Sequence, residues 1–201
     1  MDVLYRSLEH LERVIEDCHQ GRYEIDHAQQ PPFGFFSATY LGEIAICVPL
    51  SDPQGHVARL KQRVAEYPLA LQRTLVQDSL WSAEFTLAAF APKFAARGDV
   101  YGTVGCLTRA VNQLVLVLFA LNHEYLLNDK TALSEVAQFQ RCPDAFVPRV
   151  QQTLAHPGSS VAELANAVAI IGQLLRETCA LALGLYQPRY SLILQPVQRT
   201  S

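Results

Sequence analysis

One long apolar stretch decides the fold: VYGTVGCLTRAVNQLVLVLFALNHEYLL, at residues 100–127. Its hydrophobic side chains would face nearly every side of a helix, and its segment 114–121 contains no polar residue. A helix that is apolar all round must be shielded by other helices packed about it. The uninterrupted run is eight residues long, far below the roughly 18 expected of a membrane span. The stretch therefore predicts a central core helix.

Helical periodicity continues on both sides of this stretch. Before it, the spacing predicts helices at 4–21, 37–47 and 52–67, and a long helix at 69–96 that is kinked at Pro92. After it, helices are expected at 131–140, 146–155 and 160–185. Asp52-Pro53 resembles an N-cap followed by a first-turn proline, and Ser160 with Glu163 resembles a capping box.

The order of these elements predicts the fold class. The sequence shows no convincing strand, so we expect a mainly all-α protein: an up-and-down helical bundle with an irregular N-terminal third. We expect residues 1–66 to form an N-terminal segment, a remnant of or link to another domain, and residues 67–201 to form the helical bundle domain.

Composition narrows the classes of function. The 201-residue chain is 50% hydrophobic and has a formal net charge of -3, with no basic block, which does not favour a nucleic acid partner. The five cysteines stand far apart in apolar surroundings and predict free thiols in a reducing cytoplasm. The N-terminus lacks the pattern of a signal peptide. We expect a cytoplasmic protein with no membrane partner.

Polar residues interrupt the central helix in a specific pattern. They occur in Arg97-Gly98-Asp99-Val100-Tyr101, at Arg109 and Asn112, and in FALNHEYLLNDK at 119–130. This pattern resembles the C-terminal helical domain of bacterial nucleotidyltransferases related to kanamycin nucleotidyltransferase, in the DNA polymerase beta superfamily. Weaker similarity extends back through Tyr67-Pro68, the segment LSDPQG at 50–55 and DVLYR at 2–6.

The resemblance implies Mg²⁺ and ATP as cofactors, with two magnesium ions held between three carboxylates. Asp2 lies where the third carboxylate is expected, so it is the candidate metal ligand, although an N-cap aspartate is the simpler interpretation. The principal metal-binding motif is missing. The chain has no Asp-x-Asp, its nearest substitute is Glu24-Ile25-Asp26, and its one Gly-Ser pair is Gly158-Ser159. Either the catalytic half precedes this reading frame, or the chain is a stand-alone module.

Other site residues follow from the same resemblance. It implies that Lys130 and Tyr125 contact a nucleotide phosphate or the acceptor, while a solvated lysine and a half-buried tyrosine are the simpler alternatives. Arg109 within the apolar helix requires a partner or an open edge, and Asp99, Glu84 and Glu135 are candidate partners.

The predicted function is a nucleotidyltransferase-like, acceptor-side helical domain. It would serve ATP-dependent nucleotidyl transfer to a hydroxyl of a small molecule, such as an aminoglycoside-like compound, and would be inactive alone. The alternative is a non-catalytic helical interaction module that forms a homodimer or pairs with a separate nucleotide-binding subunit. Whether this chain is itself an enzyme stays open, because the resemblance and the missing motif point in opposite directions.

Overall fold

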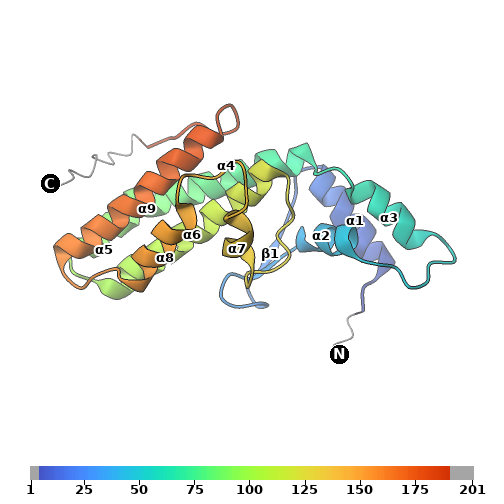
Figure 1. Cartoon of the computed structure of the whole chain (residues 1–201), viewed down its shortest axis with the longest axis horizontal. Helices are drawn as coiled ribbons and strands as arrows, with labels where there is room; N and C mark the ends of the chain where they lie inside the picture. Colours follow the sequence, from blue (N-terminus) through green and yellow to red (C-terminus); the bar gives the residue numbers. More distant parts are fainter. Residues whose placement is uncertain (1–4, 191–201) are drawn as a thin grey trace. The chain divides into compact units, whose positions relative to one another are not determined.

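The computed structural model describes residues 5–190 and confirms the mainly helical fold class (Figure 1). The chain divides into two compact units, which are described separately. Unit 1 contains residues 1–75 and 123–132, and unit 2 contains residues 76–122 and 133–201. The domain boundary expected between residues 66 and 67 falls inside unit 1.

Within the described residues, unit 1 contains the first half of α4 (Leu69–Phe85), three complete helices and one short antiparallel ribbon. The complete elements are α1 (Leu8–His19), β1 (Ile25–Asp26), β2 (Phe35–Phe36), α2 (Thr39–Ile46) and α3 (His56–Val64). The ribbon pairs Ile25 with Phe36 and Asp26 with Phe35. Sequence analysis missed this pairing, because strands of two residues are too short to show an alternating pattern.

Two helices of unit 1 begin later than predicted. The helix expected from residue 4 begins at Leu8, since the Ser7 side chain accepts a hydrogen bond from the His10 N–H. The helix expected from Asp52 begins at His56, after Gly55 in the left-handed conformation. Asp52 still caps it from a distance, because its Oδ2 accepts the Ala58 N–H at 2.9 Å. That hydrogen bond lowers the pKa of Asp52.

Lys61 ties α2 to α3 within unit 1. Its Nζ donates to the carbonyls of Ala45 at 2.7 Å and Cys47 at 2.8 Å, at the C-terminal end of α2. A cation there satisfies carbonyls that lack a helical partner and interacts favourably with the helix dipole. The α2 helix lies within the predicted range 37–47 and is confirmed.

Unit 2 is built around α6 (Val100–Asn122). Its other elements are the second half of α4 (Leu69–Phe85), the π-turn η1 (Thr86–Phe90), α5 (Ala91–Ala95), α7 (Ala132–Val136), α8 (Phe146–Ala155) and α9 (Val161–Leu181). All side chains of 114–121 are buried, and α6 packs against η1, α5, α8 and α9. In Figure 1 the long helices of this unit run back and forth beside one another.

Helix α6 ends five residues earlier than predicted, at Asn122 instead of residue 127. His123 adopts a left-handed backbone with φ 58°, which stops the helix. The Asn122 side chain donates to the Leu118 carbonyl at 2.7 Å and accepts the Arg141 N–H at 3.0 Å. Arg141 in turn donates to carbonyls at the ends of α6 and α9, Leu121 and Leu181. The C-terminal ends of two helices therefore share one cation.

The helix predicted at 69–96 is interrupted before Pro92 by the π-turn η1, and its last turn is the separate short helix α5. Proline has no N–H for the carbonyl four residues earlier, so a regular α-helix cannot continue through it. The chain widens before Pro92, and the Ala91 N–H bonds to the Thr86 carbonyl five residues back. Such turns displace the flanking side chains from their regular helical positions.

Long apolar helices also raise the question of a membrane. By length and composition, α6 and α9 could each cross one, and 67% of the most apolar part of α6 is buried inside the structure. Core helices of soluble proteins pass the same test. The expectation that no membrane is involved stays a prediction.

A buried carboxylate holds the chain beyond α9. Glu84 is only 1% exposed, and its carboxylate accepts the Arg189 N–H at 3.1 Å, the Tyr190 N–H at 2.6 Å and the Tyr186 hydroxyl. The Tyr190 ring stacks on Trp81 with 5.8 Å between centroids. Tyr190 is the last described residue, and residues 191–201 lie outside the described range.

We expect Glu84→Ala to lower the free energy of unfolding by about 2–4 kcal/mol, because three donors would lose their acceptor in a buried place. Tyr186→Phe, which removes a single donor, should cost about 1 kcal/mol. Urea denaturation followed by circular dichroism measures both. Equal effects of Glu84→Ala and of Glu66→Ala, at an exposed position, would show that the cluster adds no stability.

Candidate functional site

The segment that carries the predicted nucleotide contacts follows α6 in unit 1. Tyr125 lies inside this unit: its hydroxyl donates to the Val64 carbonyl at 3.3 Å, and its ring stacks on Tyr67 with 4.9 Å between centroids. Tyr67 also stacks on His123. Burial raises the pKa of both tyrosines. These contacts give Tyr125 a packing role in unit 1.

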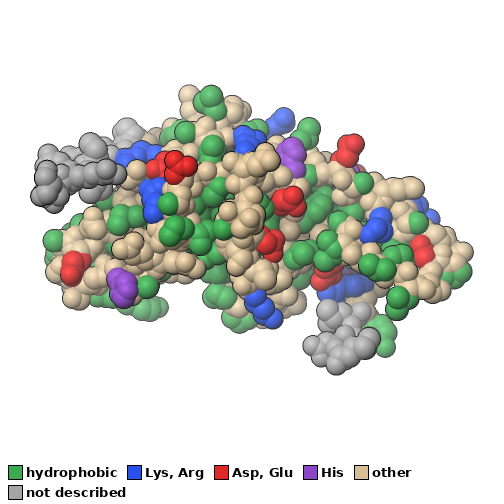
Figure 2. Space-filling model, viewed as in Figure 1, with side chains coloured by type: hydrophobic (Ala, Val, Ile, Leu, Met, Phe, Trp, Pro, Cys, Tyr) green, Lys and Arg blue, Asp and Glu red, His purple; other side chains and the backbone are tan. Residues whose placement is uncertain are grey.

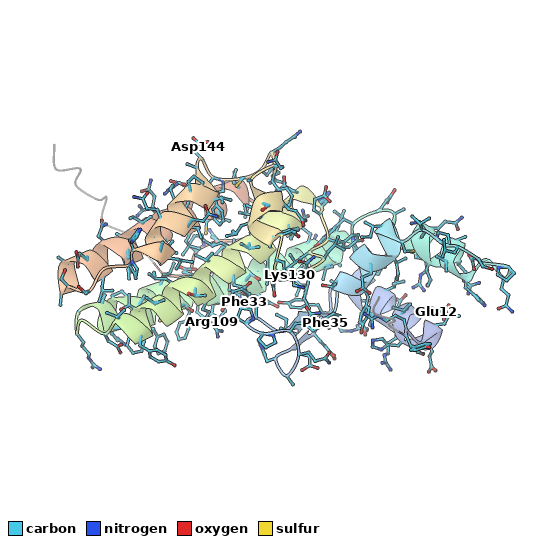
Figure 3. The ribbon with its side chains drawn as sticks, turned by 60° about the horizontal axis from the view of Figure 1, so that its bottom comes forward. Glu12, Phe33, Phe35, Arg109, Lys130 and Asp144 are labelled. Atoms are coloured by element: carbon cyan, nitrogen blue, oxygen red, sulfur yellow. The ribbon has the colours of Figure 1, made fainter. Side chains whose placement is uncertain are left out.

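Lys130 lies at the exposed end of the same segment and is labelled in Figure 3. Its backbone N–H donates to the Asn128 side chain at 2.9 Å, which forms a tight turn. Within residues 5–190, its ammonium group has no hydrogen-bond or ion-pair partner. Of the two predicted residues, only Lys130 presents a charge to solvent.

The candidate metal ligand predicted from the sequence, Asp2, lies outside the described residues. Asp26, from the Glu24-Ile25-Asp26 segment considered as a substitute metal site, uses both carboxylate oxygens within its own turn. Its Oδ1 accepts the Ala28 N–H and its Oδ2 accepts the Gln29 amide N–H. Residues 5–190 contain no group of three or more His, Cys, Asp or Glu that could hold a metal ion. The described residues therefore do not fit a magnesium pair by themselves, and we assign this chain no step through a metal.

The Gly158-Ser159 pair lies just before α9, and its donors are already engaged. Glu163 Oε2 accepts hydrogen bonds from the Ser159 N–H at 3.0 Å and from the Ser160 N–H at 2.9 Å. The Ser160 hydroxyl accepts the Glu163 N–H, which confirms the predicted capping box. A phosphate would have to displace this carboxylate, so the pair does not form a free phosphate cradle.

A pocket of about 580 Å³ with a mixed polar and apolar lining lies beside this cap, between α8 and α9 of unit 2. Ligand sites typically have volumes of about 300–1,000 Å³. The wall carries many groups that can form hydrogen bonds: Gln152, His156, Ser159, Glu163, Asn166 and Gln173. Its floor includes Ala167 and Ile170, which are apolar.

Two carboxylates near the pocket, those of Glu177 and Glu163, differ in whether they have a cationic partner. Arg149 forms an ion pair with Glu177 at 2.6 Å, and Gln173 donates to the other oxygen of Glu177 at 2.9 Å. Glu163 has no cationic partner among the described residues. The hydrogen bond from the Ser160 N–H, followed by that from Ser159, lowers the pKa of Glu163 to about 2. The Glu163 carboxylate beside the pocket is therefore ionised at neutral pH.

Sequence analysis identified the capping box but not the pocket beside it. A signal was present in the spacing of the polar residues. Gln152 lies in the last turn of α8 and His156 is its C-cap. Glu163, Asn166 and Gln173 recur at three-four multiples on α9, so the α9 residues share one side of their helix. Only the packing of α8 on α9 shows that these polar residues face a common space.

Charged side chains elsewhere are dispersed. On the face drawn in Figure 2, basic and acidic side chains are interspersed over the described residues. All five cysteines are free thiols, as predicted, and Cys18 is fully buried. Burial raises the pKa of Cys18 to about 12, so this thiol stays protonated at neutral pH.

Comparison with known proteins gives one match. A family described as "Domain of unknown function (DUF4037)" matches residues 37–130, from the start of α2 to Lys130. No curated protein and no solved structure matches the chain. The family match covers less than half of the chain and its description gives no activity, so the relation to nucleotidyltransferases stays a prediction.

The depressed pKa of Glu163 has a consequence for stability. A carboxylate with a lowered folded-state pKa stabilises the fold above its ordinary pKa of 4.5, and this contribution disappears as the pH falls from about 4.5 to about 2. We expect Glu163→Gln to lower the melting temperature at pH 7 and to flatten the loss of stability in that window. Thermal denaturation between pH 2 and pH 7 measures this. Glu66→Gln is the control, and the idea fails if both variants follow the wild-type curve.

Proposed function

We propose that this chain is the acceptor-side helical domain of a nucleotidyltransferase-like protein. In this proposal the pocket between α8 and α9 binds the small molecule whose hydroxyl receives a nucleoside monophosphate from ATP. The acceptor class is a polyhydroxylated amine, of which aminoglycosides are examples. The metal-binding carboxylates would be supplied outside the described residues, so the chain is proposed to be inactive alone.

The observation that carries the proposal is the chemistry of this pocket. A polyhydroxylated amine presents several hydroxyl groups and at least one ammonium group. The amides of Gln152, Asn166 and Gln173 can both donate to and accept from hydroxyls. The ionised Glu163 attracts an ammonium group, and its Oε1 keeps free acceptor capacity, because the cap uses Oε2.

Two further observations support the nucleotidyltransferase part of the proposal. The resemblance is strongest at residues 119–130, which include Tyr125 and Lys130. In the proposal Lys130 contacts the nucleotide phosphates, and Tyr125 fixes the segment that presents it. The packing of Tyr125 on Tyr67 suits the second role.

A second candidate function, the non-catalytic interaction module, is favoured by an exposed apolar segment of unit 1. Ile46, Val48 and Leu50, which surround the α2 C-terminus, are 65%, 81% and 99% exposed. Contiguous exposed apolar residues are typical of surfaces that bind another protein. The partner would be a second copy of the chain or a separate nucleotide-binding subunit.

We expect the chain to bind kanamycin A and not the neutral disaccharide trehalose, because Glu163 recognises an ammonium group. Asn166→Leu should weaken kanamycin binding at least tenfold by filling the pocket with an apolar side chain. Ala165→Leu, at an exposed neighbouring position on α9, should leave binding unchanged. Isothermal titration calorimetry measures the dissociation constants. Equal binding by both variants would rule out the pocket.

We further expect millimolar Mg²⁺ and ATP to raise the melting temperature, because a ligand that binds only the folded state stabilises it. Lys130→Ala should remove this increase and leave the melting temperature without ligand nearly unchanged, whereas Lys93→Ala should keep it. Differential scanning fluorimetry provides the measurement. If ATP has no effect and the sedimentation coefficient rises with protein concentration, the interaction module becomes the better explanation.

A further inference from the structure

A second, apolar groove lies in unit 2 along the first half of α6. Two hollows, of about 590 and 210 Å³, share the side chains of Cys106 and Arg109. Aromatic and aliphatic side chains form most of the wall: Phe85, Phe90, Phe94, Val100, Tyr101 and Val104. The groove has none of the amide-rich lining of the α8–α9 pocket and is a separate feature of the same unit.

Two glycines of α6 shape the groove in different ways. A Cβ on Gly102 would come within 2.4 Å of the Phe94 ring, so this glycine allows α5 to approach α6. A Cβ on Gly105 would meet nothing within 4 Å. The space above Gly105 is therefore empty although α6 is a regular helix there. Tyr101, one turn earlier, is 91% exposed at the edge of this space.

The π-turn provides the aromatic side of the groove. It lies between Phe85 and Ala91 and brings Phe85 and Phe90 together edge to face, with 5.2 Å between ring centroids. These rings are 38% and 43% exposed, although large aromatic side chains normally favour burial. Trp81 stacks on the far side of Phe85 at 5.5 Å and supports it.

Arg109 places a positive charge at the boundary of the two hollows. Its guanidinium donates to the Ser82 hydroxyl at 3.3 Å, and it is labelled on α6 in Figure 3. The expected partners Asp99 and Glu84 bond elsewhere, to the Gly102 N–H and to the segment after α9. No carboxylate within residues 5–190 lies within ion-pair distance of Arg109. A guanidinium with free donors binds carboxylates in bidentate geometry.

We propose that this groove binds a small apolar carboxylate, with its aryl or alkyl body on the aromatic wall and its anionic group on Arg109. The Ser82 hydroxyl lies close enough to Arg109 to contact the same anion. The charge complements the guanidinium of Arg109, and the apolar body removes exposed rings from water. The groove would then serve as a ligand site independent of the acceptor pocket.

The test uses the full chain with 4-phenylbutyrate and its neutral analogue 4-phenylbutanol. By isothermal titration calorimetry we expect the carboxylate to bind at least tenfold more tightly than the alcohol. Arg109→Gln should remove this difference by weakening only the carboxylate. Arg97→Gln, at an exposed position in the connection before α6, is the matched charge control and should keep the difference.

A steric pair of variants tests the position of the ligand. Gly105→Ala adds a methyl group that meets no neighbour, so binding should persist, whereas Gly105→Leu should fill the groove and reduce affinity at least tenfold. Since Ala and Leu both favour a helix over Gly, neither variant should unfold the protein, and circular dichroism checks this. Equal binding by the two variants would overturn the proposal.

Cys106 gives a readout that does not depend on affinity. Burial raises the pKa of this thiol, so alkylation with iodoacetamide is carried out at pH 9 and followed by peptide mass spectrometry. 4-Phenylbutyrate should slow alkylation of Cys106 and leave Cys47 unaffected. If the ligand protects neither thiol, and Gly105→Leu instead converts a dimer to a monomer in sedimentation, the groove is an interface between copies and the proposal fails.

Discussion

The burial of residues 114–121 of α6 is the constraint on which unit 2 depends. Consecutive side chains of a helix point in all directions, so a run without a polar residue exposes apolar surface on every side unless neighbours cover it. Helix α6 packs against α5, α8, α9 and the turn η1, and every side chain of 114–121 is buried. Burying one such side chain contributes about 1.5–3 kcal/mol, which makes the arrangement around this run the most strongly determined part of the unit.

The two halves of α6 differ in how far they are buried, and the apolar groove lies along the less buried half. Its second half is enclosed, while its first half carries two glycines, an exposed tyrosine and Arg109. The enclosed half cannot bind a ligand without losing its cover. The open half can, because Gly102 admits α5 and Gly105 leaves space beside it. One helix therefore supplies both the core and a wall of the apolar groove.

Sequence patterns predicted the elements that depend on local chemistry. The capping box of α9 and the limits of α8 were readable from the sequence, because each rests on residues within a few positions of one another. The end of α6 could not be predicted in this way. His123 has a left-handed backbone there, and its ring stacks on Tyr67, which is distant in the sequence. The start of α3 was misplaced because Asp52 caps from outside the helix. The pocket walls could not be predicted from the sequence, because they depend on which helices pack together.

The polar residues that stood out most in the sequence are largely engaged in folding. Asn122 satisfies carbonyls where α6 ends, Tyr125 donates to Val64, and Glu84 accepts three donors. Polar groups within apolar surroundings must find partners, because leaving them unpaired is costly. Such residues therefore have little hydrogen-bonding capacity left for a ligand. Asn166 and Arg109 keep this capacity and lie on exposed helix faces. Asn166 looks ordinary in the sequence, whereas Arg109 stands out as an interruption of the core helix and is the exception among such residues. Apart from Arg109, the pattern that interrupts the core helix thus indicates how the protein folds more directly than what it binds.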